Sequence, residues 1–313
     1  MKKLISIVTP TFNEGGNIKK LSEAIALQMK NLNYNYEHII IDNASKDNTQ
    51  SIIEKLCAKD KNIKAIFNAN NFGHIRSPYY GILQATGEAV ILIAADFQDP
   101  PFLIPKLIKK WEEGTEVVLL KRKTSKENLF LEMFKKLFYK IIKLISETNL
   151  TERTTGSGIF DKKIIKELKK IDEPYPYFRG LIQEITNNIK VLEFDQNKRL
   201  SGNSKNNFFT LFDIGMLGII KHSKLPLRLM TISGFVLSFT SLLIGLFFLM
   251  YKLFFWSSFQ LGLAPLILGL FFGISLQVFM LGIIGEYVGF ILTQVRKMPL
   301  IVERKRINFK QIK

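Results

Sequence analysis

Short apolar runs alternate with longer amphipathic stretches over the first hundred residues. The apolar or β-branched runs cover 4–9, 38–41, 63–67 and 89–93, and the helix-like stretches cover 17–30, 48–59 and 75–86. This alternation predicts an α/β fold, with parallel strands joined by crossover helices in a Rossmann-like sheet. Ligands of such sheets bind beyond the carboxyl ends of the strands. The polar clusters at 11–14, 42–45 and 96–99 should therefore meet at one edge.

Two long runs near the end of the sequence carry no charge. They cover 230–251 and 253–285, and each exceeds the roughly 20 apolar residues that cross a bilayer core. They predict two transmembrane helices within 226–295, with a buried helical hairpin as the alternative. We therefore expect a cytosolic domain over 1–225 and a basic cytosolic tail over 296–313.

The net charge of +17 raises the question of a nucleic-acid or a membrane partner. The cations flank the apolar runs and are not interleaved with an aromatic platform, which favours a lipid surface over nucleic acid. Lys221, Lys224 and Arg228 precede the first run, and Arg296, Lys297, Arg304, Lys305 and Arg306 follow the second. The positive-inside bias then predicts an integral inner (plasma) membrane protein with both termini cytoplasmic. The lone Cys57 allows no intrachain disulfide, which fits the cytosol.

Two further stretches have the pattern of amphipathic helices. Over 127–146, apolar residues recur at helical spacing with lysines between them, and 207–220 shows a weaker version of the pattern. Such helices can lie in the lipid interface with their lysines at the headgroups. Packing on the sheet, with a solvated lysine face, is the alternative.

An acidic turn, AADFQDPP, follows the apolar run at 89–93. If the strand continues through it, Asp96 and Gln98 point the same way into a cleft, where their oxygens would suit Mg²⁺ or Mn²⁺. A metal there would neutralise charge on a departing diphosphate. Asp99 precedes two prolines and also has the pattern of a helix N-cap.

Four segments, IVTPTFNEGGNI, IDNASKDNT, the acidic turn with the residues before it, and GIIGEYVGFILTQVRKMPLIVER, carry a family resemblance. Together they resemble the family 2 glycosyltransferases of the polyprenyl-phosphate type, such as dolichol-phosphate mannose synthase and undecaprenyl-phosphate glucosyltransferase. The resemblance covers almost the whole chain. It implies a nucleotide-diphospho-sugar fold of the GT-A type, with interfacial helices and two C-terminal membrane helices.

The resemblance also implies roles for single residues. Those bordering the nucleotide would be Pro10, Phe12, Asn13, Glu14 and Asp42. Next to Asp42, Asn43 stands where a second aspartate is common. Asp96 and Gln98 would hold the metal, although Ala94 stands where an aspartate is frequent. Asp99 would act as a base or orienting group near the acceptor phosphate. In KRLSGNSK, the residues that would grip this phosphate are Arg199, Ser204 and Lys205, with Arg179 as a further cation. A solvated basic loop is the alternative for KRLSGNSK.

The resulting hypothesis is the inverting transfer of a sugar from a nucleotide sugar, a UDP-hexose, to undecaprenyl phosphate at the cytoplasmic membrane face. A homo-oligomer is expected by the same resemblance. A processive polysaccharide synthase is one alternative, although it should have more spans and a Gln-x-x-Arg-Trp motif. A non-catalytic membrane scaffold that retains the fold is another, and a flippase is a third. No residue identifies the sugar.

Overall fold

The computed structural model describes residues 2–123, 154–195, 225–255, 263–296 and 298–309. The strands are β1 Leu4–Thr11, β2 Asn35–Asp42, β3 Ile63–Asn68, β4 Ala89–Leu92, β5 Val117–Arg122, β6 Thr154–Asp161, β7 Ile189–Phe194 and β8 Glu303–Ile307. The helices are α1 Ile18–Lys30, α2 Thr49–Lys59, α3 Gly73–Leu83, the short η1 Pro101–Leu103, α4 Ile104–Glu112, α6 Lys162–Lys170, α7 Phe178–Ile185, α9 Leu225–Phe254 and α10 Leu263–Val295. The predicted alternation of strands and helices in the first hundred residues is confirmed.

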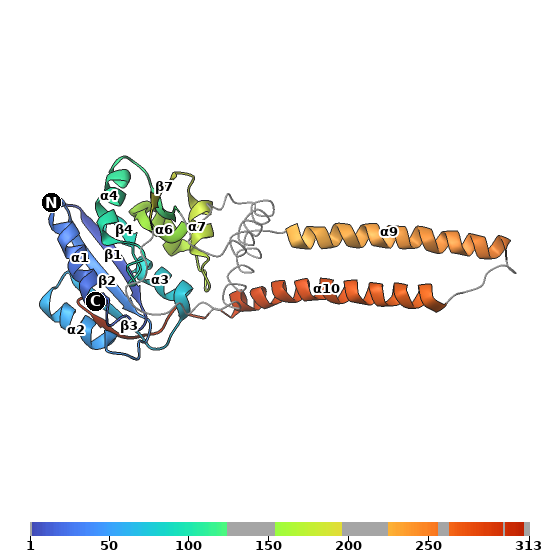
Figure 1. The fold of residues 1–313 in the computed structure, drawn as a ribbon, viewed down its shortest axis with the longest axis horizontal. Coiled ribbons are helices and arrows are strands. Elements are labelled where there is room, and N and C mark those ends of the chain that lie inside the picture. Colours follow the sequence, from blue (N-terminus) through green and yellow to red (C-terminus); the bar gives the residue numbers. More distant parts are fainter. Residues whose placement is uncertain (1, 124–153, 196–224, 256–262, 297, 310–313) are drawn as a thin grey trace.

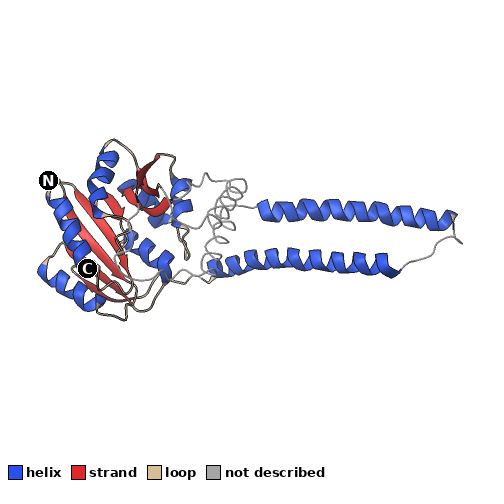
Figure 2. Cartoon of the chain, viewed as in Figure 1, coloured by secondary structure: helices blue, strands red, loops and turns tan. Residues whose placement is uncertain are grey.

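One mixed sheet, drawn in red in Figure 2, organises the described residues. Its strand order is β7-β5-β6-β4-β1-β2-β3-β8. β1 pairs in parallel with both β2 and β4, and β2 pairs in parallel with β3. β6 is antiparallel to its neighbours β4 and β5. β1 therefore lies at the centre, and its carboxyl end is flanked by those of β2 and β4.

Helices cover both faces of this sheet, which explains why its central strands are largely apolar and buried. On one face, α3, α6 and α7 pack over residues such as Val8, Ile39 and Phe160. On the other face, α1 and α4 pack over Ile5 and Ile7, and α2 packs beside them over Ile40. The site must therefore lie at an edge, because both faces are buried.

The C-terminal segment was predicted to be a basic tail, but residues 303–307 form β8, which pairs antiparallel with β3. Hydrogen bonds just before and just after β8 support this pairing. The Ala69 N–H donates to the Val302 carbonyl over 2.8 Å, and Asn308 Nδ2 donates to the carbonyls of Cys57 and Ile63. The prediction missed β8 because ERKRI has no apolar run, as is common for a charged edge strand.

α9 and α10 leave the sheet domain side by side (Figure 1). Within them, Leu225–Phe247 and Gly269–Val295 are long and apolar enough to cross a membrane, and neither stretch is buried in the protein. At the base of α10, Gln294 Nε2 donates to Glu173 Oε1 of the sheet domain over 2.7 Å. The predicted interfacial helices at 127–146 and 207–220 lie outside the described residues. The domain boundaries at 225 and 295 stay predictions.

Candidate functional site

Three loops meet at the carboxyl edge of the central strands. Thr11 at the end of β1 is in register with Asp42 at the end of β2, and Val8 of β1 is in register with Leu92 at the end of β4. The loops that follow these strands contain the three predicted polar clusters. The structure thus brings together residues that are up to about ninety positions apart in the sequence, at the edge where such sheets bind ligands.

Asp42 organises the loop after β2. The side chain is fully buried, and Oδ1 accepts from the Ser45 hydroxyl over 2.5 Å, while Oδ2 accepts from the Ser45 N–H over 3.0 Å and from Gln50 Nε2 over 2.8 Å. Thr11 Oγ1 lies 3.4 Å from Oδ1. With both oxygens occupied, the carboxylate of Asp42 shapes the loop that would hold a nucleotide.

Ser45 joins the loops after β1 and β2. Its hydroxyl donates to Asp42 and accepts from the Asn13 N–H over 2.8 Å, and Asn13 Oδ1 accepts in turn from the Lys46 N–H over 2.8 Å. Asn13 and Ala44 have φ values of 57° and 60°, a left-handed conformation that is uncommon for residues other than glycine. These strained backbones persist because the side-chain bonds between the loops hold them.

The other predicted nucleotide residues lie in the same place. Pro10 and Phe12 are half-buried at the end of β1, and Asn13 is exposed beyond them. The Glu14 N–H donates to Thr49 Oγ1 of α2 over 2.9 Å, and its carboxylate accepts from Asn17 Nδ2 over 2.7 Å. The five predicted residues therefore form one cluster around the start of α2, which is compatible with their predicted role.

Asn43 fixes the loop after β3. Its Oδ1 accepts from Asn68 Nδ2 and from the Phe72 N–H, and its Nδ2 donates to Asn71 Oδ1 over 2.7 Å and to the Gly73 carbonyl over 3.2 Å. An aspartate could accept the first two bonds but could not donate the others. This explains in physical terms why an amide occupies the position.

The acidic turn does not continue the strand. β4 ends at Leu92, and Phe97 has φ 61° while its ring packs on the apolar cluster under α1 and α4. Asp96 Oδ1 accepts from the Gln98 N–H over 3.1 Å, which closes a tight turn. The argument from strand alternation was therefore wrong for Asp96 and Gln98, although both remain at the carboxyl edge, with Asp96 buried and Gln98 half-buried.

Asp99 is not a helix N-cap. Residues after it form η1 and then α4, whose cap positions are Pro100 and Leu103, and neither helix has a side-chain cap. Instead Asp99 Oδ2 accepts from the Ser157 hydroxyl of β6 over 2.5 Å. Its other oxygen, Oδ1, is buried and has no hydrogen-bond partner among the described residues. Burial raises the pKa of the Asp99 carboxyl, the charge of Asp96 adds to this, and Ser157 and Arg122 oppose it.

One cation acts directly on this acidic pair, and a second contacts the strand that contains Ser157. Arg122, at the end of β5, is close enough to act on the pKa of Asp99. Arg179 on α7 donates through Nη2 to the Thr155 carbonyl over 3.2 Å and covers Gly156, whose φ is 83°. Arg179 was predicted, whereas Arg122 and Ser157 were missed. Nothing in TTGSG or in VVLLKR distinguishes a site residue from a surface one.

The oxygens of Asp96, Gln98 and Asp99 suit a divalent cation. Hard cations prefer such ligands, and a cation would satisfy the buried Asp99 Oδ1 while relieving the repulsion between the two carboxylates. Within the described ranges no cluster of three or more His, Cys, Asp or Glu is arranged to hold a metal. Any cation here would therefore take its remaining ligands from substrate phosphate or water.

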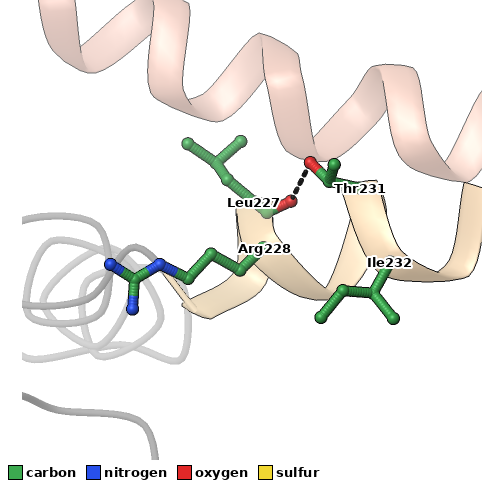
Figure 3. Close-up of a pocket in the computed structure, with 4 residues that line it drawn as sticks. All are labelled: Leu227, Arg228, Thr231 and Ile232. Atoms are coloured by element: carbon green, nitrogen blue, oxygen red, sulfur yellow. Dashed lines mark hydrogen bonds between the residues drawn. The ribbon is translucent and has the colours of Figure 1, made fainter. Parts of the chain in front are cut away.

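Other predicted residues lie elsewhere. Arg199, Ser204 and Lys205 are outside the described residues. A cavity of about 390 Å³ is lined by Leu227, Arg228, Thr231 and Ile232 at the start of α9. In Figure 3 the guanidinium of Arg228 extends away from the helix, while Thr231 Oγ1 donates to the Leu227 carbonyl over 3.0 Å. This hollow belongs to neighbouring turns of one helix, and it contains none of the predicted nucleotide or metal residues.

Comparisons with known proteins agree with this geometry. The model of the family described as "Glycosyl transferase family 2" matches residues 6–169. A protein of Bacillus subtilis (strain 168) named "Uncharacterized glycosyltransferase YkcC" is 32% identical over 96% of this chain and 93% of its own length. The "Bactoprenol glucosyl transferase" of Shigella phage SfII is 30% identical over 96% of this chain and 97% of its own length.

Among solved structures, glucosyl-3-phosphoglycerate synthase from Mycobacterium tuberculosis has a TM-score of 0.50 and 15% identity. The match covers 70% of this chain and 76% of that one. This likeness concerns the fold alone, and the predicted GT-A type of sheet is confirmed. The family match, the near full-length relatives and the architecture lead to one conclusion: the chain belongs to glycosyltransferase family 2.

Proposed function

We propose that the enzyme transfers a hexose from a UDP-sugar to a polyprenyl phosphate, undecaprenyl phosphate, at the cytoplasmic face of the membrane, with inversion at the anomeric carbon. The observation that carries the proposal is that the acidic turn and the loops after β1 and β2 lie at the same edge of the sheet. The acidic turn with Asp96 and Asp99 adjoins the loops held by Asp42 and Ser45, in a domain joined to two candidate membrane helices.

The relatives support the class of acceptor and sugar. Proteins named "Bactoprenol glucosyl transferase" match this chain over nearly their whole length, including the region of α9 and α10. A bactoprenol acceptor and a glucosyl donor are therefore the first substrates to test. The solved relative with a TM-score of 0.50 was crystallised with Mn²⁺ and UDP, which makes this pair the first donor-side ligands to test.

A phosphate acceptor reduces the need for a strong catalytic base. A phosphate monoester has a second pKa near about 6, so most of it is already a dianion at neutral pH. It does need cations to dock it and to offset its repulsion from the donor diphosphate. We assign this part to Arg122, which is close enough to act on Asp99, and to Arg179, which contacts Thr155 of β6. We keep the prediction that Arg199, Ser204 and Lys205 contribute. Asp99 would orient the acceptor.

The residues that would hold the metal are Asp96, Gln98 and Asp99. A bound Mg²⁺ or Mn²⁺ supplies neutralisation of the charge that develops on the departing nucleoside diphosphate. The protein's own part is to hold the donor between the loops after β1, β2 and β4, so that the anomeric carbon faces the acceptor from the side opposite the diphosphate. Attack from that side inverts the configuration.

The sheet supports a hairpin arrangement in the membrane. β3 precedes α9 in the chain and β8 follows α10, yet the two strands pair. Strands that pair must lie on the same side of a bilayer, which requires an even number of crossings between them. Arg228 in the first turn of α9 and Arg296 just after α10 favour the cytoplasm as that side. The predicted homo-oligomer stays a prediction, and sizing of the purified protein in detergent tests it.

The decisive experiment incubates the purified full-length protein with Mn²⁺, undecaprenyl phosphate and labelled UDP- and GDP-sugars, and measures label in the lipid phase. We expect label from UDP-glucose, a single sugar per lipid, and loss of transfer in Asp96→Asn. The matched control is Asp172→Asn, an exposed aspartate outside the loops after β1, β2 and β4, which should behave as the parent does.

Other outcomes identify the alternatives. Products with several sugars per lipid would indicate a processive synthase. Nucleotide binding without transfer from any sugar would favour a non-catalytic scaffold. Transfer that survives Asp96→Asn unchanged would refute the role given to the acidic turn.

A further inference from the structure

A bulge in β8 directs two consecutive side chains toward α2. Lys305 pairs with Phe67 of β3 and Glu303 pairs with Asn68, so Arg304 is one extra residue in the ladder. Consecutive side chains of a regular strand point to opposite faces. Here the Arg304 Nη2 donates to Gln50 Oε1 over 2.6 Å and Lys305 Nζ lies 2.7 Å from Glu54 Oε1, and both partners belong to α2. Bulges commonly re-aim side chains beside active sites.

Arg304 fixes the orientation of the Gln50 amide. A guanidinium can only donate hydrogen bonds, so it must face the amide oxygen. The amide nitrogen is thereby turned toward the loop after β2, where Nε2 donates to Asp42 Oδ2 over 2.8 Å and to the Ser45 carbonyl over 3.1 Å. Without Arg304, the half-buried Gln50 amide could rotate and present its oxygen to the carboxylate of Asp42, which is repulsive.

The Gln50 amide holds both ends of the strained 42–45 loop of the proposed donor site. Its two acceptors, Asp42 and Ser45, flank Ala44, whose φ is 60°. Ser45 in turn accepts from the Asn13 N–H in the loop after β1. We call Arg304, Gln50, Asp42 and Ser45 the Arg304 relay. It connects a strand that lies beyond the second membrane helix to both loops around the proposed nucleotide site.

We propose that Arg304 and Gln50 are positioning residues for the donor nucleotide, which they hold in place by fixing the 42–45 loop. The proposal rests on the proposed function, because that function places the nucleotide beside this loop. Loss of one hydrogen bond in the relay should weaken UDP binding by about threefold to tenfold, the range that net hydrogen-bond energies give. The maximal rate of transfer should change by less than about twofold, because neither residue reaches the acidic turn.

The test compares Arg304→Met, Gln50→Met and the double variant with the parent, all as full-length protein in detergent. UDP affinity is measured by calorimetry with Mn²⁺, and KM for UDP-glucose and kcat are measured by lipid labelling. We expect each single variant to raise the Kd for UDP and the KM. The double variant should be no worse than Gln50→Met alone, because Arg304 acts through Gln50.

Lys305→Met is the matched control. Lys305 is the next residue of β8 and also pairs with α2, but its partner Glu54 has no contact with the loop. Its variant should keep the affinity of the parent for UDP while sharing any small loss of thermal stability. The relay is refuted if Arg304→Met and Lys305→Met bind UDP equally well, or if the Arg304→Met and Gln50→Met effects multiply.

Failure of the relay and failure of the proposed function are distinguishable. UDP affinity needs no acceptor, so it tests the relay even where no sugar reaches the lipid. If Asp96→Asn abolishes transfer while Arg304→Met binds UDP normally, only the relay is wrong. If the parent binds neither UDP nor GDP, the donor site is wrong and the relay falls with it.

Discussion

Ser45→Ala should both loosen the site and destabilise the domain, because the Ser45 hydroxyl makes one bond within the loop after β2 and one to the loop after β1. It donates to the fully buried Asp42 over 2.5 Å and accepts from the Asn13 N–H over 2.8 Å. A hydrogen bond to a charged group contributes about 1.5 to 3 kcal/mol. Asn13 is exposed, so water can replace part of the second bond, whose loss costs roughly 0.5 to 1 kcal/mol. The expected loss is about 2 to 4 kcal/mol.

The measurement is the thermal unfolding midpoint of the full chain in detergent, followed by UDP affinity. One kcal/mol corresponds to roughly 2 to 4 °C for a domain of this size, so the midpoint should fall by at least about 4 °C. Ser51→Ala is the matched control, because Ser51 is an exposed serine of α2 whose hydroxyl bonds only the nearby Asn48 carbonyl. It should shift the midpoint by less than about 1 °C.

The loss should also appear in binding. With the two loops uncoupled, Ala44 can leave its left-handed conformation, and UDP must restore that conformation before it binds. If Ser45→Ala keeps both the midpoint and the UDP affinity of Ser51→Ala, the loops are not held by this hydroxyl and the account of the donor site is wrong.

Three further outcomes follow from the structure. Gly158→Ala should prevent folding or lower expression severely, since a Cβ there would lie 2.1 Å from the Val118 carbonyl oxygen; recovery of well-folded variant by size-exclusion chromatography would contradict this. Burial lowers the pKa of His38 to about 3. Below pH 6.5 the unfolded chain therefore binds a proton at His38 that the folded chain does not bind. This group should lower the free energy of unfolding by about 1.4 kcal/mol for each pH unit that the pH falls. The unfolding midpoint of His38→Gln should therefore fall less between pH 6 and 4.5 than that of the parent, and parallel curves would refute the assignment. Chelation with EDTA should abolish sugar transfer and added Mn²⁺ should restore it, while transfer that persists in EDTA would exclude the divalent cation.

The central strands were predictable because they are buried on both faces. Such strands are mostly apolar or β-branched on both faces, as at 4–9 and 89–93, and the structure places β1 and β4 there. The acidic turn shows where this reasoning stops. Alternation was extended from Ile93 through Gln98, but Phe97 turns left-handed because its ring packs on the cluster under α1 and α4. This contact of Phe97 with distant residues, which no local sequence pattern reveals, ends the strand alternation on which the predicted orientation of Asp96 was based.

The clustering of the candidate residues at one sheet edge was predictable, but their hydrogen-bond partners were not. The clusters around Asn13 and Asp42 could be assigned to one edge, because parallel strands end together. The bonds that complete them come from Ser45, Gln50 and Ser157, ordinary polar residues whose role depends on distant segments. Ser157 reaches Asp99 across fifty-eight positions. Only the folded chain identifies such pairs.

The cations after the second span show how the same charges can be misread from sequence. Arg304, Lys305 and Arg306 were counted as a membrane-facing flank, but they face Gln50, Glu54 and Glu303 within the sheet domain. Exposed ion pairs such as Lys305 with Glu54 contribute little stability. These residues contribute mainly to orientation, because they belong to β8. The pairing of β8 with β3 holds the base of α10 against the domain that carries the proposed donor loops. The orientation argument therefore does not depend on counting these three charges. It depends on the shared sheet, which would place both ends of the proposed membrane hairpin on one side, and on Arg228 and Arg296, which favour the cytoplasm as that side.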